Sequence, residues 1–287
     1  MMHLHRDTRI LIVGLGLLGG SYALALKKKG FRCIYGFARR QDTVDYALEH
    51  VMIDEGSAEV DAELIARAEM IVFALYPTVL LKWMEDYGHL IQPGTVVTDV
   101  TGVKSCIIDP VTKALPAGAE FVSVHPMAGK EVGGIENADE TIFNGANYIV
   151  VPTPENTEHA IRLCEDLGAE LGFARISRLS PEEHDDMIAF LSQLTHCVAV
   201  SLMCASDDDR LVAYTGDSFR DLTRIARIND EMWSELFLLN KEALLRQMDS
   251  FTAQMEKMRG YLASDDREGL REMMRVSTAR RAKFDRK

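Results

Sequence analysis

Cysteine is scarce in this chain, and the few cysteines are scattered. The 287 residues contain five, with no C-x-x-C pair and no clustering of the kind that ligates metal: Cys33, Cys106, Cys164, Cys197 and Cys204. An odd, dispersed set argues against a disulfide framework and against a metal site. Such a set is typical of buried thiols in a reducing compartment, so we expect a cytoplasmic protein.

Basic charge and long apolar runs are also in short supply. Lys and Arg number 32 against 44 Asp and Glu, which gives a net charge of −12. This acidic balance argues against nucleic acid or an anionic membrane as the main partner. No run approaches the roughly 18 apolar residues of a membrane-spanning helix, and the polar residues 1–8 lack the apolar core of a secretory signal. We therefore expect neither nucleic acid nor a membrane as partner.

The most informative feature present is a glycine-rich turn near the N-terminus. A strand-like run over 9–13 leads into this turn, a helix-like stretch over 21–29 follows, and a second strand is expected over 33–37; the turn reads Gly14, Leu15, Gly16, Leu17, Leu18, Gly19. G-x-G-x-x-G in this context is the fingerprint of a dinucleotide-binding βαβ unit. The first glycine permits the turn, the second lets the backbone approach a pyrophosphate, and the third lets the helix pack close to the sheet. The alternative is an ordinary turn with excess glycine.

The end of the second strand indicates which dinucleotide is bound. Enzymes that select NAD usually place Asp or Glu there to bind the ribose 2′-hydroxyl. This chain has Ala38, followed by Arg39 and Arg40. A carboxylate would repel a 2′-phosphate, whereas a guanidinium pairs with it. We therefore predict NADP, with NAD as second choice, unless the two arginines are only solvated loop charges.

Strand-like and helix-like segments alternate over residues 1–177. Further strands are expected at 70–74, 96–99, 121–125 and 148–151. This alternation predicts an α/β domain with a Rossmann-type doubly wound parallel sheet, which binds its ligand beyond the carboxyl ends of the strands. Residues that close these strands are therefore candidates for cofactor or substrate contact, among them Leu75, Tyr76, Thr101 and His125.

The pattern changes at Ser180, which begins a stretch without strand signals. Ser180 is a good N-cap, Pro181 suits the first turn, and no proline follows it. Amphipathic helical patterns continue to the C-terminus, so residues 178–287 are expected to form an all-helical domain. Their long apolar faces require burial, and a homodimer through this domain is one solution. The alternative is that these helices only pack against one another.

Histidine and arginine supply the candidate chemistry. His125 lies at a strand end before Pro126, where a histidine can act as acid or base near neutral pH. In the helical half His184 and Asp185 occupy a first turn, and Ser192 and His196 share a helix face. Arg220 and Arg224 also share a face, and we expect Arg220 to pair with its neighbouring aspartates and Arg224 to bind a substrate carboxylate. With a dinucleotide, this set predicts hydride transfer from a carbon bearing a hydroxyl.

Over nearly its whole length the chain resembles the prephenate dehydrogenase family, which includes the cyclohexadienyl (arogenate) dehydrogenases of tyrosine biosynthesis. The resemblance rests on six segments: 13–21, 54–55, 99–104, 125–129, 180–185 and 219–226. It implies the oxidative decarboxylation of prephenate to 4-hydroxyphenylpyruvate, in which hydride leaves the carbon bearing the 4-hydroxyl and carbon dioxide leaves the ring.

The resemblance also implies roles for individual residues. His125 would accept the proton of the 4-hydroxyl and Arg224 would bind the substrate carboxylate. Ser192 and His196 would line the substrate pocket, and Lys130 and Glu131 would contact the side-chain end of the substrate. Many members have a serine where this chain has Gly102, and Thr101 is the candidate to supply that hydroxyl to the histidine and the nicotinamide.

Three alternatives remain open from the sequence. Arogenate, whose side chain carries an ammonium, could be the substrate, with Glu131 favouring it and Lys130 favouring prephenate. A β-hydroxyacid or imine reductase shares the two-domain plan but does not suit the segments around His125 and Arg224. A non-catalytic NADP-binding protein would retain the fold, and only Gly102 favours this interpretation.

Overall fold

A six-stranded parallel sheet forms the centre of the N-terminal half. The computed structural model describes residues 4–130 and 132–284. The strands run in the order β3-β2-β1-β4-β5-β6, all parallel, which is the Rossmann order with a topological switch between β1 and β4. Their bounds are β1 Ile10–Val13, β2 Ile34–Phe37, β3 Glu55–Ser57, β4 Met70–Phe73, β5 Val96–Asp99 and β6 Glu120–Phe121.

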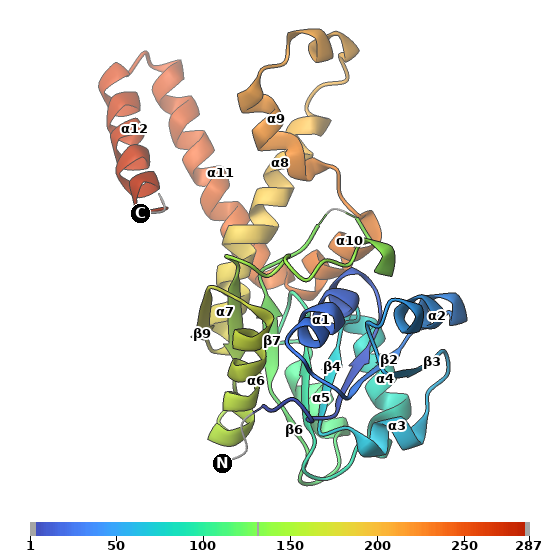
Figure 1. Cartoon of the computed structure of the whole chain (residues 1–287). Coiled ribbons are helices and arrows are strands. Elements are labelled where there is room, and N and C mark those ends of the chain that lie inside the picture. The colour runs from blue at the N-terminus through green and yellow to red at the C-terminus, as the bar shows by residue number, and fades with distance from the viewer. Residues whose placement is uncertain (1–3, 131, 285–287) are drawn as a thin grey trace.

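Helices cover both faces of this sheet because successive strand side chains point to opposite sides. Ile10 and Ile12 of β1 pack with α1 and α6, while Leu11 and Val13 pack with α3, α4 and α5 (Figure 1). The helices of this half are α1 Leu17–Lys28, α2 Gln41–Glu49, α3 Ala62–Arg67, α4 Pro77–Tyr87, η1 Gly88–Leu90, α5 Ile108–Ala114 and α6 Glu158–Leu171. The prediction of a doubly wound α/β sheet is confirmed, and α1 begins four residues earlier than expected.

A second, three-stranded sheet departs from the prediction. The strand expected over 121–125 divides into β6 in the main sheet and β7 (Ser123–Pro126), which pairs antiparallel with β8 (Asn147–Val151). β8 pairs in parallel with β9 (Arg175–Arg178), and η2 (Ile135–Asn137) lies between β7 and β8. Phe121 extends the parallel sheet as predicted, but the prediction that 123–125 and 148–151 also do so is wrong. Short buried strands carry no sequence signal for their pairing partner.

The C-terminal half is helical, as predicted. Ser180 accepts from the Glu183 backbone, and the Glu183 side chain accepts from the Ser180 backbone, so a capping box begins the first helix. The elements are α7 Pro181–Ile188, the π-helical segment η3 Ala189–Gln193, α8 Leu194–Cys204, η4 Asp209–Tyr214, α9 Asp217–Thr223, η5 Arg224–Ala226, α10 Asp230–Leu239, α11 Lys241–Ala263, α12 Arg267–Arg281 and η6 Ala282–Phe284.

α7, η3 and α8 form one continuous helix. In the described part of the chain, Pro181–Cys204 is the one helix long and apolar enough to cross a membrane by length and composition. Its most apolar 18-residue window has a mean hydropathy of 1.7, and 28% of that window is buried in the protomer. Polar residues such as Gln193 and His196 interrupt this helix, so it contains no unbroken run of about 18 apolar residues.

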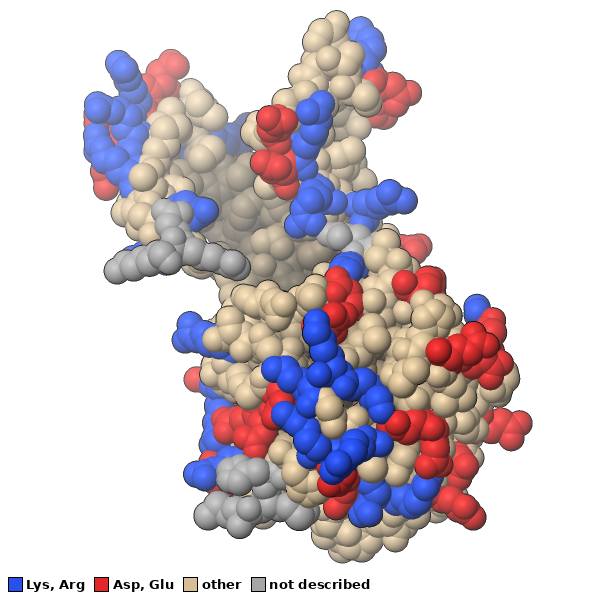
Figure 2. All heavy atoms as spheres, in the orientation of Figure 1, with Lys and Arg blue, Asp and Glu red and all other residues tan. Residues whose placement is uncertain are grey.

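Two helical arms rise from the α/β body (Figure 1). α8 and α9 form one arm, and α11 and α12 form the other. Figure 2 shows a hollow between them surfaced mainly by uncharged side chains. Exposed apolar residues on α8 and α11 include Leu202, Met203, Leu245, Met248, Phe251, Met255 and Leu262. The helices of this protomer therefore do not bury one another's apolar faces completely.

Candidate active site

The glycine turn between β1 and α1 has the geometry expected of a pyrophosphate cradle. Gly14 adopts φ +103°, and a Cβ on it would lie 2.4 Å from the Ala74 carbonyl oxygen. A Cβ on Gly19 would lie 1.9 Å from the Gly14 carbonyl oxygen, whereas one on Gly16 would meet no atom within 4 Å. Gly16 caps α1 without a side-chain hydrogen bond, so the first-turn N–H groups of α1 are available to an anion. The residues present therefore fit a dinucleotide.

Beyond this turn, the ends of β2 and β4 add the other predicted cofactor contacts. Arg40 pairs with Asp42 through two hydrogen bonds of 2.8 and 2.6 Å. Arg39 is exposed and makes no hydrogen bond or ion pair with residues 4–130 or 132–284. Leu75 lies close to Gly14, and Tyr76, which is 43% exposed, caps α4. Of the two arginines, Arg39 is thus the one whose charge is uncompensated by a neighbour.

His125 lies inside β7, where it meets the first helix of the C-terminal half. Its Nδ1 is 2.9 Å from Nε2 of the buried His184, and Nδ1 of His184 is 2.8 Å from Oδ1 of Asp185. Asp185 also accepts from the backbone N–H groups of Lys104 and Ser105, at 2.9 and 2.8 Å. His125 is partly exposed, and its Nε2 makes no hydrogen bond with any described residue. This nitrogen is placed to exchange a proton with a ligand.

A buried ion pair lies beneath the histidines. The Lys104 ammonium and the Asp99 carboxylate, both with fully buried side chains, are 2.8 Å apart. Lys104 also donates to the Val124 carbonyl at 2.6 Å, and Asp99 accepts from the side chain of Ser123 and the backbone N–H of Val124. This network joins the end of β5 to β7, so it fixes the strand that carries His125.

Thr101 belongs to the same buried network instead of facing a ligand. It is 4% exposed, its hydroxyl bonds the Asp99 carboxylate and the Val103 carbonyl, and its N–H donates to Asp99 at 2.9 Å. The expectation that its hydroxyl replaces the missing serine is not met by this geometry. At Gly102 a Cβ would lie 3.7 Å from the Leu236 side chain and 3.9 Å from Cε1 of His125. A serine would therefore fit beside the histidine.

Burial sets the protonation of this cluster. It lowers the pKa of His125 well below the usual histidine value, and the Lys104 charge, together with any positive charge on His184, acts in the same direction. Burial also lowers the pKa of His184, opposed by its bond to Asp185. Burial of Asp185 acts to raise its pKa, but hydrogen bonds from His184 and Ser105 outweigh this and the net shift is downward. Both histidines are consequently neutral and Asp185 ionised near pH 7.

The junction of η3 and α8 packs against α10 and carries the next two predicted substrate residues. The ring of His196 stacks on Trp233 of α10 at 3.7 Å, and its Nδ1 lies 2.8 Å from the Ser192 carbonyl oxygen. Ser192 lies in the π-helical segment, and Gln193 beside it donates to the Leu236 carbonyl at 3.0 Å. The expectation that Ser192 and His196 are neighbours on one face is confirmed.

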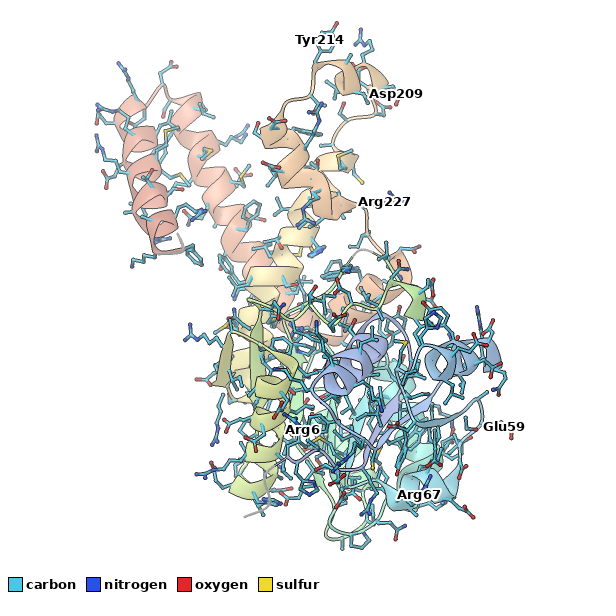
Figure 3. All side chains as sticks on the ribbon, in the orientation of Figure 1. Arg6, Glu59, Arg67, Asp209, Tyr214 and Arg227 are labelled. Carbon is cyan, nitrogen blue, oxygen red and sulfur yellow. The ribbon has the colours of Figure 1, made fainter. Side chains whose placement is uncertain are left out.

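The two arginines after Gly216 lie in different elements, and the expected pairing of Arg220 with a neighbouring aspartate is confirmed. Arg220 pairs with Asp217 at 3.3 Å, and Arg224 begins η5, which packs against α8. In Figure 3, Tyr214 and Asp209 lie at the far tip of the α8–α9 arm, and Arg227 lies near its root. Arg224 is therefore on the same helical wall as His196, and not on the sheet that carries His125.

The loop after β7 carries the last two predicted substrate residues. Lys130 forms an ion pair of 2.8 Å with Asp139, and the two side chains are 39% and 33% exposed. Its charge is thus partly neutralised within the loop. Glu131 lies outside the described residues.

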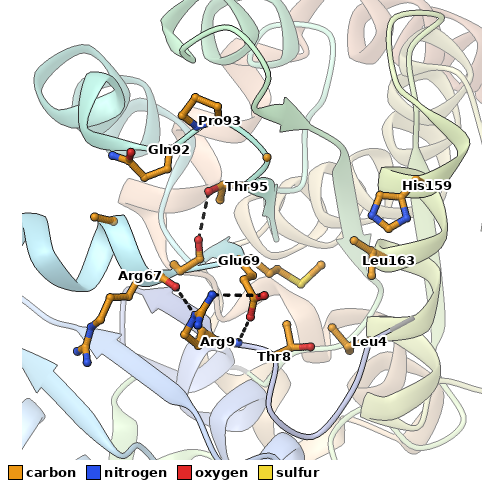
Figure 4. Close-up of a pocket in the computed structure, with 14 residues that line it drawn as sticks. Leu4, Thr8, Arg9, Arg67, Glu69, Gln92, Pro93, Thr95, His159 and Leu163 are labelled. Atoms are coloured by element: carbon orange, nitrogen blue, oxygen red, sulfur yellow. Dashed lines mark hydrogen bonds and ion pairs between the residues drawn. The ribbon is translucent and has the colours of Figure 1, made fainter. Parts of the chain in front are cut away.

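A separate cavity lies at the opposite edge of the main sheet. Its volume is about 250 Å³, and it is lined by residues at the amino ends of β1, β4 and β5 together with α6 (Figure 4). The Arg9 side chain donates to the Arg67 carbonyl at 2.6 Å and pairs with Glu69, and Thr95 donates to the Ala68 carbonyl. Arg9, Glu69 and Thr95 are therefore already bound to other residues of the lining. Ligands of such sheets bind at the carboxyl ends.

Sequence reasoning missed most of the residues that hold His125. Lys104 and Asp99 were noted only as parts of a motif, and His184 and Asp185 only as a polar first turn. The available signal was the lysine itself, since a lysine shortly after a buried strand is a candidate for a buried partner. The contact between His125 and His184 spans 59 residues, and no periodicity reports it.

Comparisons with known proteins agree with this geometry. Residues 22–176 match the family model "Prephenate dehydrogenase, nucleotide-binding domain", and residues 180–276 match "Prephenate dehydrogenase, dimerization domain". A prephenate dehydrogenase of Bacillus subtilis is 32% identical over 279 residues, which cover 94% of this chain and 74% of that protein.

Solved structures resemble the chain over almost its full length. A prephenate dehydrogenase of A. aeolicus, in complex with hydroxyphenyl propionate and NAD⁺, has a TM-score of 0.90 at 26% identity and covers 99% of this chain and 100% of its own. An arogenate dehydrogenase of Synechocystis has a TM-score of 0.84 at 26% identity and covers 97% and 100%. With both domains matched in order, the chain belongs to the prephenate dehydrogenase family of oxidoreductases.

Proposed function

We propose that this protein catalyses the NADP-dependent oxidative decarboxylation of prephenate to 4-hydroxyphenylpyruvate. The observation that carries the proposal is His125, whose Nδ1 is anchored by His184 while Nε2 makes no hydrogen bond with a described residue. A neutral imidazole with one unprotonated nitrogen can act as the general base that removes the hydroxyl proton while the carbon is oxidised. We assign residues 1–177 to cofactor binding and residues 178–287 to substrate binding and dimerisation.

The proposed mechanism uses His125 twice. Its Nε2 accepts the 4-hydroxyl proton as hydride leaves the same carbon, and it returns that proton to the ring oxygen once carbon dioxide has left and the ring is aromatic. A dinucleotide held at the glycine turn over 14–19 would supply the hydride acceptor. The products are 4-hydroxyphenylpyruvate, carbon dioxide and reduced cofactor, with no net proton uptake. Thr101 acts as a positioning residue through Asp99, because its hydroxyl is buried.

The cofactor preference depends on Arg39. Ala38 carries no carboxylate to repel a 2′-phosphate, and Arg39 has no ion-pair partner among the described residues. Arg40 is already bound to Asp42 and serves as the matched control. Arg39→Gln should lower kcat/KM for NADP about tenfold or more, the scale of one charge-assisted phosphate contact, and leave that for NAD nearly unchanged. Arg40→Gln should have a smaller effect on the ratio of kcat/KM for NADP to kcat/KM for NAD. An equal effect of both variants on both cofactors would contradict the assignment.

Substrate binding is assigned to the helical wall and the loop after β7. Arg224 on η5 would bind the carboxylate, and Ser192 and His196 would line the pocket. Arg224→Lys should raise KM for the substrate more than it lowers kcat, because a lysine loses bidentate geometry. Lys130 and Glu131 would contact the side-chain end. Since Asp139 partly neutralises Lys130, arogenate is the alternative substrate.

The decisive assay combines prephenate or arogenate with NADP⁺ or NAD⁺ and follows reduced cofactor. Turnover of prephenate with NADP⁺ well above the other three mixtures supports the proposal. A preference for arogenate would make arogenate the substrate in place of prephenate. Reduction of NAD⁺ alone would show that Arg39 is a surface charge without a role in cofactor binding. Cofactor binding without turnover in any mixture would support the non-catalytic alternative.

We also propose a homodimer through the helical half. Its support is the apolar surface that α8 and α11 leave exposed, including Met255 at 52% and Phe251 at 38% exposure. Association of two chains would cover this surface, in agreement with the family model matched by residues 180–276, which is described as a dimerization domain. Met255→Glu would place a carboxylate in that interface and should shift the protein toward monomer in light scattering. An exposed position such as Glu256→Gln, one residue along, is the control.

A further inference from the structure

We infer that His184 and Asp185 are positioning residues that fix the tautomer of His125 and share the positive charge it acquires. The inference rests on the proposed function, because it specifies how the proposed base is held ready. Its basis is the unbroken chain of hydrogen bonds from His125 through His184 to Asp185. Neither His184 nor Asp185 is exposed to a ligand, since His184 is fully buried and Asp185 is 6% exposed.

The direction of every proton in this chain follows from Asp185. An ionised carboxylate accepts and does not donate, and it already accepts from two backbone N–H groups. His184 must therefore donate through Nδ1, which leaves its Nε2 as an acceptor. His125 must in turn donate through Nδ1, which leaves its own Nε2 unprotonated. Both histidines are thus held as the Nδ1–H tautomer, and the nitrogen of His125 without a partner is the basic one.

The same chain stabilises the charged form of His125. When Nε2 takes a proton, the imidazolium at His125 strengthens its bond to His184, and the bond from His184 to Asp185 strengthens with it. The carboxylate therefore acts on the reacting histidine across a neutral ring. The other ionisable groups near the pair are Lys104, held by Asp99, and Cys106. Lys104 opposes a positive charge on His125, so Asp185 is the group that favours it.

Asp185→Asn tests the direction of the protons. An amide oxygen in the place of Oδ1 still accepts from the Lys104 N–H and from His184, but it carries no charge and its NH2 faces the Ser105 N–H, so the Nδ1–H tautomers are held less firmly. An amide turned so that its NH2 donates to His184 reverses both tautomers, and His125 then presents Nε2–H. The matched control is Asp186→Asn, which makes the same chemical change one residue away. Asp186 is exposed and pairs with Arg246 at 2.9 Å, outside the chain of hydrogen bonds.

The first measurement is ¹⁵N NMR of histidine-labelled protein near neutral pH, without substrate. His125→Asn and His184→Gln identify the two sets of ring signals by subtraction. We expect both residues to carry hydrogen on Nδ1, to remain so in Asp186→Asn, and to show a larger fraction of the Nε2–H form in Asp185→Asn. A wild-type His125 protonated at Nε2 would overturn the inference. This result does not depend on turnover, so it is separate from a failure of the proposed function.

The second measurement is the pH dependence of kcat/KM. Asp185→Asn should lower the plateau by about 10²-fold or more, the scale of general-base catalysis. Its acid limb should move to lower pH, because loss of the carboxylate charge destabilises the imidazolium. The KM of this variant for the cofactor should stay within about twofold of the wild-type value. A variant that only melts earlier, with an unchanged kcat and pH profile, would show that the pair merely packs.

Discussion

Two alanine substitutions in the glycine turn should separate folding from cofactor binding. A methyl group at Gly19 would lie 1.9 Å from the Gly14 carbonyl oxygen, and a carbon–oxygen contact needs about 3.3 Å. α1 would have to move away from the turn by about 1.4 Å, the difference between those two distances. At Gly16 no heavy atom lies within 4 Å of the added methyl group, so that substitution meets only the space where the pyrophosphate would lie.

The magnitudes differ accordingly. Overpacking costs about 1–3 kcal/mol, and the partner here is backbone that cannot rotate away, so we take about 3 kcal/mol for Gly19→Ala. In a chain of this size that lowers Tm by about 6–12 °C. Gly16→Ala should leave Tm unchanged or raise it slightly, because alanine restricts the unfolded chain. It should weaken cofactor binding about tenfold or more, equivalent to about 1.4 kcal/mol.

Thermal unfolding without ligand and titration of NADP⁺ and NAD⁺ by fluorescence measure the two effects. Gly30→Ala is a control for removing a glycine away from the turn: it has φ +86° and no neighbour within 4 Å, so only strain is added. If Gly16→Ala bound both dinucleotides as tightly as the wild type, the turn would not be the pyrophosphate cradle. If Gly19→Ala melted with the wild type, the close approach of α1 to the turn would not contribute to stability.

Three further predictions concern the residues around His125. Gly102→Ser should have a Tm within about 2 °C of the wild-type value, because a Cβ at this position makes only ordinary contacts with Leu236 and His125. A larger fall in Tm by calorimetry would show that a side chain does not fit there. The folded state lowers the pKa of His125 and His184, so the unfolded chain binds more protons than the folded one below pH 6.5. The free energy of unfolding should therefore fall as pH falls, by up to about 1.4 kcal/mol per pH unit for each histidine. If His125→Asn left the slope of the denaturation midpoint against pH unchanged, this reasoning would be wrong. Lys104→Met should cost about 3–5 kcal/mol in urea unfolding, because it leaves the Asp99 carboxylate buried without its cation; a loss below about 1 kcal/mol would mean that the remaining donors satisfy it.

Features that depend on near neighbours in the sequence were predicted well. The turn from Gly14 to Gly19 is local, and each glycine meets the steric demand that its place in the motif implies. The N-cap at Ser180 and the pair of Arg220 with Asp217 each involve residues three apart. Chain geometry over a few residues decides such features, so the sequence contains the whole argument.

Features that depend on pairing between distant segments were not predicted from the sequence. The strand at 121–125 was identified, but its second half leaves the parallel sheet and pairs antiparallel with β8. Its short apolar run suits either sheet, and only packing against the rest of the domain selects one. Thr101 was taken for a ligand-facing hydroxyl, yet the fold brings Asp99 to it and buries both.

The sequence by itself determined the dinucleotide turn, the alternation of strands and helices in the first half with helices alone after Ser180, and a strand that carries His125, because local periodicity and spacing encode all three. The tertiary structure decided how that histidine is held. It brought His184 and Asp185 to His125 across 59 residues, and it placed Lys104 against Asp99 without solvent. The physical reason is that burial and hydrogen-bond direction arise only when distant elements pack, and these two quantities set the protonation of the site.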